Sequence, residues 1–448
     1  MMRTLMWTRH HVLLGVLLLG NTIAFAGVDP VTRLATAVLV LVMMVDLRTP
    51  PAVPALHRWA VWVLAGLVVV QLVPLPAAVR GLLQPGFAPV LASEWGTISL
   101  APWATAQVAA SVVVMFGIAL VAARMAVTRT GLPALLIVLA TTGVVLSLLG
   151  MAGESGAPER VLLMRPNSGG GSPYGPFVNT NHFAQAVELT VPASVILLAG
   201  AVRRAAEGGL GRQRSVVLGL SAGVACAVGI AALIRSESRG GMLFLAVAAI
   251  TTLPLWRRFR PRWSWKWVAI GGVVLVVVLS LTSARLAVVR DGFSDLLIVE
   301  GIEGNTRWDL WRGTLRSWQR SPLLGSGLGS YRYVIGMDKP ATGNQVLEQA
   351  HSDWLEWLAT GGLVGAAVLL LMVAGVALQL EPRGVRQMRC EFRYALAGAS
   401  LALVATALHE AVGFGLQTPL NRYLLAAWVG LAWGADRFRI RQDDEERA

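Results

Sequence analysis

Long apolar runs alternate with short polar or basic stretches along the whole chain. The clearest runs are VLLGVLLLGNTIAFAG, AVWVLAGLVVVQLV, VAIGGVVLVVVLSL and LVGAAVLLLMVAGVALQL. Each approaches the ~20 residues that a helix needs to cross a bilayer. The pattern therefore predicts an all-α, polytopic integral membrane protein with about twelve transmembrane helices. The predicted spans are residues 10–27, 31–47, 58–74, 104–124, 131–151, 181–201, 214–234, 238–256, 267–283, 354–379, 393–412 and 420–436.

Basic residues concentrate in every second connection between these spans. With the N-terminus placed in the cytoplasm, the inner connections include the basic stretches 257–266 and 383–393, whereas basic and acidic residues nearly balance in the outer segments. Cytoplasmic loops of membrane proteins carry an excess of Lys and Arg. The alternation therefore predicts that both termini lie on the cytoplasmic side.

The first apolar run has features of two kinds of segment. Arg3 and Arg9 precede it and Ala24-Phe25-Ala26 ends it, as in a cleavable signal peptide. Asn21 interrupts the apolar region, however, and the predicted orientation holds when the run is kept. An uncleaved first span is the favoured interpretation.

Three outer segments are long, namely 75–103, 152–180 and 284–353, and loops of such length are usually functional or disordered. In the longest, four apolar residues recur at the spacing of one helical face. They are Trp308, Trp311, Leu315 and Trp318. This spacing predicts a helix from about Asn305 to Arg320, whose aromatic face would suit the membrane surface. The chain thus divides into N-terminal spans (1–283), an outer loop (284–353) and C-terminal spans with a cytoplasmic tail (354–448).

Composition agrees with a membrane protein. Of the 448 residues, 55% are apolar and 14% charged, whereas soluble domains carry about 25% charged residues. The net charge of +13 does not indicate nucleic-acid binding, because the basic residues lie in short loops between spans. The two cysteines, Cys226 and Cys390, indicate neither a disulfide framework nor a thiolate metal site.

Arginines gather in the outer segments. Arg239 lies in RSESRGG, a connection of a few residues, and its planar guanidinium suits a phosphate. A lipid headgroup, or a salt bridge to Glu237 or Glu188, is the alternative. Further basic residues, Arg307, Arg312 and Arg316, form a stripe on the predicted outer helix, where pairing with Asp309 or Glu303 or contact with headgroups is an equally ordinary role.

Three histidines, His182, His351 and His409, lie at the predicted outer ends of spans. A lone histidine there is more often a hydrogen-bonded structural residue than a catalyst. Histidine is nonetheless the commonest general base near neutral pH. His351 stands out because it directly follows the arginine-bearing loop.

Metal and nucleotide chemistry are disfavoured. The outer carboxylates are scattered, and neither an Asp-x-Asp pair on that face nor a His-x-x-x-His motif occurs. Mg²⁺ and Mn²⁺ require clustered oxygen ligands, and no P-loop or dinucleotide fingerprint is present. We expect neither metal nor cofactor. Arginines with a histidine suit the displacement of a diphosphate carried on a membrane lipid, with the leaving charge neutralised by guanidinium groups.

Five segments together resemble the bacterial O-antigen ligase and polysaccharide polymerase family. They are GPFVNTNHFAQAVELTVP, SESRGG, GNTRWDLWRGTLRSWQRSPLLGSGLGSY, AHSDWLEWLATGGLVG and HEAVGFGLQTPLN, and they extend over most of residues 170–425. Each is weak alone, but their order and the topology fit the family.

The resemblance implies a metal-independent, usually inverting glycosyltransferase with an undecaprenyl-diphosphate-linked glycan as donor. It places two diphosphate-binding arginines on Arg239 and Arg307 and the general base on His351. Candidate supporting residues are Arg312, Arg316, His182, Asn179, Asp353, Glu356 and His409. Related sequences often have an aspartate where this chain has Gly413, so His409 is only a supporting candidate.

The acceptor stays open between lipid A–core (a ligase), a second lipid-linked repeat unit (a polymerase) and a protein hydroxyl. Partners expected are the lipid-linked donor, the acceptor and membrane lipids, in a bacterial inner membrane with the site facing the periplasm. A secondary transporter is the rival class, although transporters tend to show repeats and polar groups at the midplane. A scaffold without chemistry would not explain the arginines beside span ends.

Two features at the start of the span 354–379 have ordinary structural interpretations. Asp353 and Glu356 are three residues apart, which is the spacing of a capping box, and both suit the positive end of a helix. Trp354 and Trp357 fit the aromatic belt at a membrane interface.

Overall fold

The structure is a computed structural model. It describes residues 2–47, 51–90, 93–128, 130–153, 160–167, 172–207, 212–257, 302–338, 347–379 and 390–445. The predicted ninth span, 267–283, lies outside these residues, as do 284–301 and 339–346 of the long outer segment. The predicted division of the chain at 283 and 353 therefore stays a prediction.

The described residues form an all-α bundle, as the hydrophobic pattern predicts. The long helices are α1 (Met2–Ile23), α2 (Pro30–Val45), α3 (Ala55–Leu72), α5 (Pro102–Ala126), α6 (Gly131–Gly153), α7 (Thr180–Glu207), α8 (Arg212–Arg235), α9 (Arg239–Arg257), α14 (Asp353–Gln379), α16 (Cys390–Glu410) and α17 (Pro419–Glu445). Two short antiparallel sheets of two strands each also occur in this part of the chain. They pair β1 (Leu75–Pro76) with β2 (Trp95–Gly96) and β3 (Arg160–Val161) with β4 (Arg165–Pro166).

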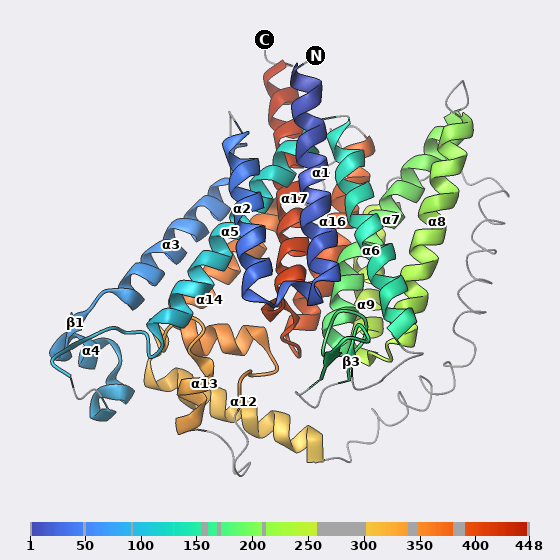
Figure 1. The fold of residues 1–448 in the computed structure, drawn as a ribbon. Coiled ribbons are helices and arrows are strands. Elements are labelled where there is room, and N and C mark those ends of the chain that lie inside the picture. Colours follow the sequence, from blue (N-terminus) through green and yellow to red (C-terminus); the bar gives the residue numbers. More distant parts are fainter. Residues whose placement is uncertain are drawn as a thin grey trace.

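Seven of these helices are long and apolar enough to cross a membrane, which identifies a polytopic membrane protein. They are α3, α5, α6, α7, α8, α14 and the stretch Phe392–Glu410 of α16, and α2 and α9 contain shorter apolar helices. The structure thus confirms the class and part of the expected count of twelve. α17 coincides with a predicted span but is more polar. It lies at the centre of the bundle, where a helix covered by protein need not be as apolar as one that faces lipid (Figure 1).

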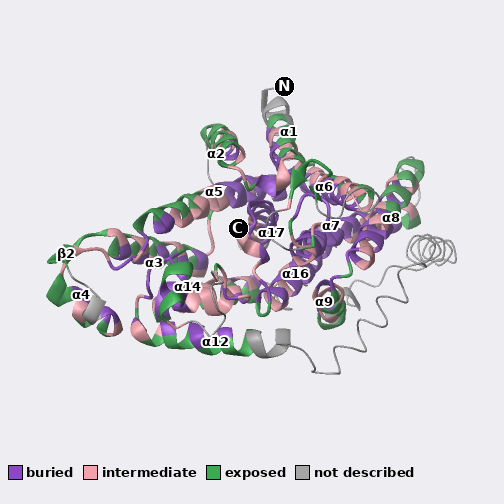
Figure 2. Cartoon of the chain, turned by 60° about the horizontal axis from the view of Figure 1, so that its bottom comes forward, coloured by how far each residue is buried: buried purple, intermediate pink, exposed green. Residues whose placement is uncertain are grey.

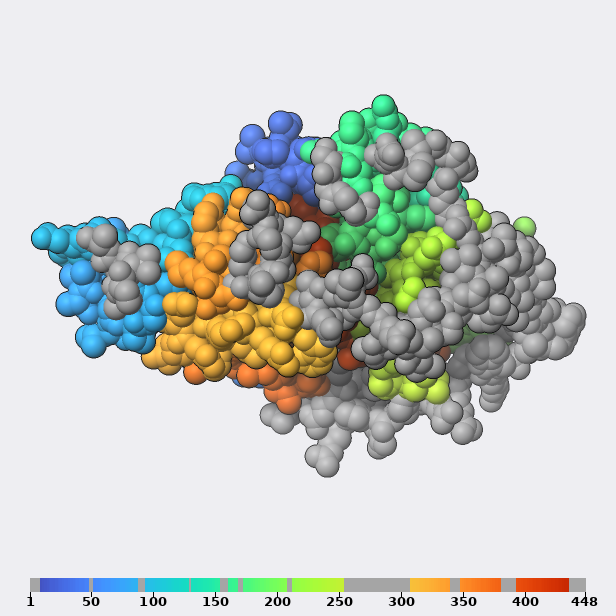
Figure 3. Space-filling view, turned by 90° about the horizontal axis from the view of Figure 1, so that it is seen from below, coloured from blue at the N-terminus to red at the C-terminus, as the bar shows by residue number. Residues whose placement is uncertain are grey.

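Both chain ends lie at one end of the bundle, and α12 (Ile302–Arg320), α13 (Tyr331–Val334) and α4 (Ala77–Leu83) lie at the other (Figure 1). We call the second one the outer end, because the charge pattern predicts that it faces the periplasm. Seen from below, α12 and α13 lie across the outer end beside the segment that contains α4 (Figure 3). Segments that are far apart in the sequence therefore lie side by side at the outer end, where they can contribute residues to one site.

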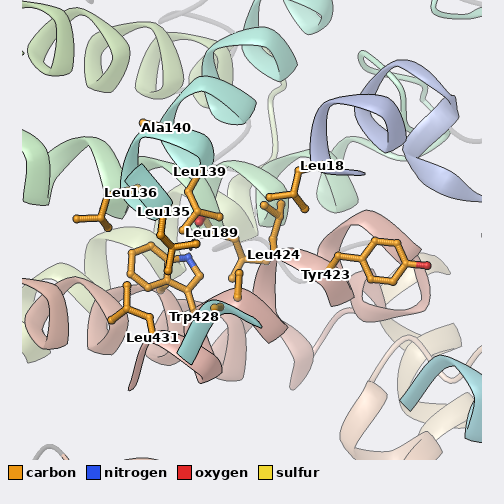
Figure 4. Close-up of a cluster of buried hydrophobic side chains, with 14 of the residues drawn as sticks. Leu18, Leu135, Leu136, Leu139, Ala140, Leu189, Tyr423, Leu424, Trp428 and Leu431 are labelled. Carbon is orange, nitrogen blue, oxygen red and sulfur yellow. Dashed lines mark hydrogen bonds between the residues drawn. The ribbon is translucent and has the colours of Figure 1, made fainter. Parts of the chain in front are cut away.

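The main core surrounds α17. Trp428 is fully buried among leucines of α6 and α17, and its indole N–H donates to the carbonyl of Leu189 on α7 at 2.6 Å (Figure 4). Burial is heaviest along α7, α16 and α17, whereas α2, α3 and α8 carry exposed faces (Figure 2). Those exposed faces are rich in Val, Leu and Trp, as expected where a helix meets lipid.

Two glycines let α17 approach α5 closely. Gly430 and Gly434 are one helical turn apart, and a Cβ on Gly430 would fall on the carbonyl oxygen of Ala119. A Cβ on Gly434 would lie 2.6 Å from the carbonyl oxygen of Ala123. Small residues spaced in this way are typical of close helix contacts in membranes, where packing rather than water exclusion drives association.

α14 is interrupted at Gly362, whose φ of 65° and ψ of −163° are not helical. The segment after α12 fills the interruption. The N–H groups of Leu363 and Val364 donate to the carbonyls of Pro322 (2.8 Å) and Leu323 (3.1 Å), so the amides that the break releases are satisfied. A Cβ on Gly362 would lie on the carbonyl of Leu323, which explains the glycine there.

A buried glutamine of α3 holds the same junction. Gln71 donates to the carbonyls of Leu324 (2.7 Å) and Thr360 (3.0 Å), and its side-chain oxygen accepts from the N–H of Leu328 (2.9 Å). The glycine-rich PLLGSGLG stretch, which the resemblance singles out, therefore packs into the helix break.

The outer helix α12 matches its predicted extent of about 305–320, but its tryptophans do not share one membrane-facing surface. Trp311 donates to the carbonyl of Ala350 (3.1 Å), and Trp318 donates to that of Pro322 (3.1 Å). Trp308 and Leu315 are exposed. The expected aromatic face is thus divided, because Trp311 bonds to the residue before His351 and Trp318 bonds to the segment that follows α12.

We predict that Gly430→Ala forces α5 and α17 apart and lowers the free energy of unfolding by about 1–3 kcal/mol. The measurement is thermal unfolding of the purified protein in detergent. Gly66→Ala is the matched control, because Gly66 has nothing within 4 Å of an added Cβ and lies on the exposed side of α3. A Gly430→Ala protein as stable as the control would contradict the close packing.

Candidate active site

The start of α14 is built differently from the expected capping box. The hydroxyl of Ser352 accepts from the N–H of Leu355 at 3.4 Å, so Ser352 is the N-cap. Glu356 instead reaches back past the cap and accepts the N–H of Ala350 at 3.0 Å. The capping-box interpretation of Asp353 and Glu356 is therefore wrong, and Glu356 fixes the residue that precedes His351.

His351 is held in an uncommon backbone conformation, with a φ of 51°. Its neighbour Ala350 is tied on both sides, by its N–H to Glu356 and by its carbonyl to Trp311. A left-handed residue persists only where surrounding contacts maintain it, and such residues cluster at functional sites. The half-buried imidazole is thereby given a defined position at the outer end.

Burial, and then the positive charge of Arg307 at the start of α12, lower the pKa of His351 from its ordinary value. Both effects disfavour the imidazolium form. Arg307 itself is exposed and has no ion-pair partner among the described residues. The side chains that the sequence singled out as base and diphosphate ligand are thus electrostatic neighbours.

Phe414 links two of the three histidines. Its ring packs edge-on against His351 with a centroid distance of 4.7 Å and against His182 with a distance of 4.6 Å. His182, near the start of α7, faces the hydroxyl of Thr418 through Nδ1 at 3.2 Å, and its buried Nε2 lacks a partner in the described part of the chain. His182 lies within electrostatic reach of both His351 and His409.

The third histidine, His409 at the end of α16, pairs with a carboxylate inside the bundle. Its Nδ1 lies 2.9 Å from Oε1 of Glu188 on α7, and both side chains are buried. The ring packs against Phe244 of α9 at 5.3 Å, and a Cβ on Gly413 would lie 3.0 Å from Cδ2 of the ring. Glu188 thus pairs with a histidine, not with Arg239.

Arg239 is the first residue of α9. Ser238 caps this helix, because its hydroxyl accepts the N–H of Gly241 at 3.3 Å and donates to Asn181 of α7 at 2.7 Å. Arg239 is exposed and makes no ion pair with any described residue. An unpaired guanidinium at the positive end of a helix is suited to an anion.

A network of buried polar side chains lies next to the histidines. The amide of Gln417 donates to Glu356 (2.9 Å) and Asp353 (3.3 Å), while the amide of Gln185 donates to Glu410. The amide of Asn421 donates to Gln185 and to the backbone carbonyl of His182, both at 3.0 Å, and Asp353 and Glu410 interact electrostatically where the two parts meet. The network connects the starts of α7, α14 and α17 with the end of α16.

Remaining candidates have structural roles here. Asn179 accepts the N–H of Asn181 at 2.8 Å and so caps α7. Arg312 pairs with Asp309 at 3.5 Å on the exposed side of α12, as the ordinary interpretation expected, and Arg316 acts electrostatically on Asp338.

The two tryptophans at the start of α14 also have roles inside the protein. Trp354 donates to Ala407 (3.0 Å) and Trp357 donates to Gly365 (2.8 Å). They are therefore packing residues as well as possible interface residues. Among the described residues, no three His, Cys, Asp or Glu side chains are grouped so that they would hold a metal ion.

The sequence alone did not place several of these residues in the site, although Glu188 is named above as an alternative partner of Arg239. Gln185 and Glu188 lie in a span at helical spacing from Asn181, and regularly spaced polar residues in a span indicate an inward face. That signal was available. Phe414 and Gln417 lie in HEAVGFGLQTPLN, but no periodicity marks them, since the chain there leaves the helix.

Fold and site together define a polytopic α-helical membrane protein whose outer end gathers three histidines, exposed arginines and a buried polar network. Comparison with known families identifies the type more closely. Residues 224–370 match the family model described as O-antigen ligase, which confirms the resemblance. The comparison with curated proteins gives no match.

The matched region includes Arg239, Arg307 and His351, but it ends before His409 and begins after His182. It indicates an enzyme of the O-antigen ligase and polymerase type, and hence glycosyltransferase activity on lipid-linked glycans.

We predict that Glu356→Ala loosens the position of His351. The N–H of Ala350 and the amide of Gln417 would lose their acceptor, which costs about 1–3 kcal/mol of stability. We expect kcat for glycan transfer to fall by roughly ten- to a hundredfold with a smaller change in the KM for donor. Glu348→Ala, which removes an exposed carboxylate two residues before Ala350, is the control and should change neither quantity. An unchanged kcat in Glu356→Ala would rule out this positioning role.

Proposed function

We propose that the protein is an O-antigen ligase that transfers a glycan from an undecaprenyl-diphosphate carrier to a hydroxyl group of lipid A–core. The reaction would take place on the periplasmic side of a bacterial inner membrane, as a step in building lipopolysaccharide. The observation that carries the proposal is that His351 has the exposed guanidinium of Arg307 as an electrostatic neighbour, and that this charge and burial both favour the neutral imidazole. The family match over the same residues supports it.

Arg239 and Arg307 are the proposed ligands of the donor diphosphate. Each is exposed and forms no ion pair with a described residue. Arg239 adds its charge to the positive end of α9, whose first N–H groups have no partner within the helix. Guanidinium groups bind diphosphate oxygens through paired hydrogen bonds and neutralise the charge that develops as the diphosphate leaves.

His351 is the proposed general base. Its imidazole accepts the proton of the acceptor hydroxyl as the oxygen attacks the anomeric carbon. The bond from that carbon to the diphosphate oxygen breaks, and its electron pair stays with the departing diphosphate. Attack from the face opposite the leaving group inverts the anomeric centre. Because burial and Arg307 both lower the pKa of His351, the histidine stays neutral and able to accept a proton at ordinary pH.

The first test removes the base. We expect His351→Ala to lower kcat by about 10²–10⁴-fold while the protein stays folded, because general-base catalysis contributes on that scale. The assay supplies purified lipid-linked glycan with lipid A–core, or lipid-linked glycan alone, to protein in lipid. A product on lipid A–core supports a ligase, and a lengthened lipid-linked glycan shows a polymerase. Near-normal transfer by a folded His351→Ala protein would overturn the assignment.

The second test addresses Arg239. We expect Arg239→Gln to weaken donor binding by about tenfold or more and to leave acceptor binding nearly unchanged, since charge-assisted hydrogen bonds to one substrate are lost. Arg332→Gln is the matched control, because Arg332 is an exposed arginine paired with Glu348 at 3.5 Å. Equal losses for donor and acceptor would count against a diphosphate role.

The third test uses pH. Activity falls at low pH as His351 gains a proton, and removing the positive charge of Arg307 makes protonation easier. We therefore expect Arg307→Gln to move the acidic limb of kcat to higher pH, measured at saturating donor so that weaker binding does not interfere. An acidic limb at the wild-type position would show that Arg307 does not act on the base.

A further inference from the structure

A cavity lies at the end of the bundle opposite the candidate active site. α7 begins at the outer end, near His182, and runs through the bundle, so its last turn lies at the end where both chain termini lie (Figure 1). We call this the inner end. The cavity has a volume of about 70 Å³ and lies between the start of α6, the end of α7 and the start of α16. None of the residues proposed to act on the donor or the acceptor lines it.

The walls of this inner cavity are mostly apolar. Five buried side chains contribute to them, namely Leu132 and Leu136 of α6, Ile196 and Leu197 of α7, and Phe392 of α16. Gly200 of α7 also lines the cavity, and a Cβ added to it would have only the Nη2 of Arg204 within 4 Å, at 3.7 Å. The absence of a side chain at Gly200 therefore helps to keep the space open.

The last turns of α7 contribute the charged side chains of the lining, which are Arg203, Arg204 and Glu207. The Nε of Arg203 lies 2.8 Å from Oε1 of Glu207, so these two charges compensate each other. Arg204 is half-buried and forms no ion pair with a described residue, and its guanidinium lies beside Gly200. These three side chains thus leave one positive charge in excess, next to an apolar cavity.

The position and the chemistry of the cavity fit a phospholipid. α6 and α7 are both long and apolar enough to cross a membrane, and the ends of such helices lie at the level of the lipid headgroups. A guanidinium suits a phosphate, and basic pockets between membrane-spanning helices bind anionic headgroups. The volume of the cavity is roughly that of two water molecules in the liquid, so it admits a small polar group and not a whole lipid.

We infer that the inner cavity binds the phosphate of an anionic glycerophospholipid, with Arg204 as its principal ligand. The acyl chains then lie outside the cavity along the apolar surface of the bundle, where Ile137 of α6 is exposed next to Leu136. This site is separate from the proposed glycan transfer and does not depend on it. Because the lipid contacts three helices in their folded arrangement, its binding stabilises the folded bundle.

The experiment titrates delipidated, full-length protein in detergent with phosphatidylglycerol and measures the dissociation constant of the first bound lipid by native mass spectrometry. Arg204→Gln should weaken this binding by about tenfold, because a charge-assisted hydrogen bond is lost. Gly200→Leu fills the cavity but keeps all three charged side chains, and it should weaken binding to a similar extent.

Each variant has a matched control. Arg212→Gln removes an exposed arginine at the start of α8 that does not line the cavity, and Gly66→Leu adds the same side chain at an exposed glycine with nothing within 4 Å of an added Cβ. Both controls should bind phosphatidylglycerol as the parent protein does. Thermal unfolding checks that each variant is folded, and Gly200→Val replaces Gly200→Leu if the larger side chain prevents folding.

Two further probes identify the ligand. Phosphatidylcholine, whose headgroup has no net charge, should bind more weakly than phosphatidylglycerol, and inorganic phosphate at the same concentration should not displace the lipid. Equal affinity for the two lipids, displacement by inorganic phosphate, or binding that neither Arg204→Gln nor the Gly200 variant weakens would overturn the inference. A loss in Arg204→Gln without a loss in the Gly200 variant would show attraction to surface charge alone, and it would likewise overturn the cavity site.

Discussion

The outer end depends on one interruption, the break of α14 at Gly362. A broken helix inside a membrane protein releases backbone N–H and C=O groups that lipid cannot satisfy. Here the segment from Pro322 to Gly327 supplies the missing partners. Gln71 of α3 donates hydrogen bonds both to this segment and to α14. Because that segment follows α12 directly, the break also determines where α12 lies and thus where Arg307 stands. A side chain at Gly362 would remove the room for this insertion.

Polar groups at this end fall into two sets: buried carboxyl and amide groups that bond to one another, and exposed arginines. Gln417 donates to the carboxyl group of Glu356, Gln185 donates to that of Glu410, and Asn421 donates to Gln185. The exposed arginines at the starts of α9 and α12 remain available to an anion. This division is what a site for a diphosphate and a hydroxyl requires, since one substrate needs positive charge and the other needs a neutral base.

The matched family region and the site are not the same set of residues. The match over 224–370 contains the three residues proposed to act on the substrates. Residues around them lie outside the matched region. Glu188 belongs to α7, and Phe414 and Gln417 belong to the segment between α16 and α17. A chain fragment limited to the matched region would therefore have the proposed ligands without the contacts that orient them.

The sequence by itself determined the helical class, the approximate limits of eleven described helices and the side on which the charged residues collect. Hydrophobic runs of bilayer length and the distribution of arginines are local properties, so they can be read without knowing what each helix touches. Motif resemblance also singled out Arg239, Arg307 and His351. Only the tertiary structure decided that Glu356 reaches back to Ala350, that Trp311 bonds to the carbonyl of Ala350, and that Glu188 pairs with His409 across 221 residues. The reason is physical: in a low-dielectric interior a buried polar group is stabilised by a hydrogen-bond partner, and which partner it contacts depends on how distant helices pack.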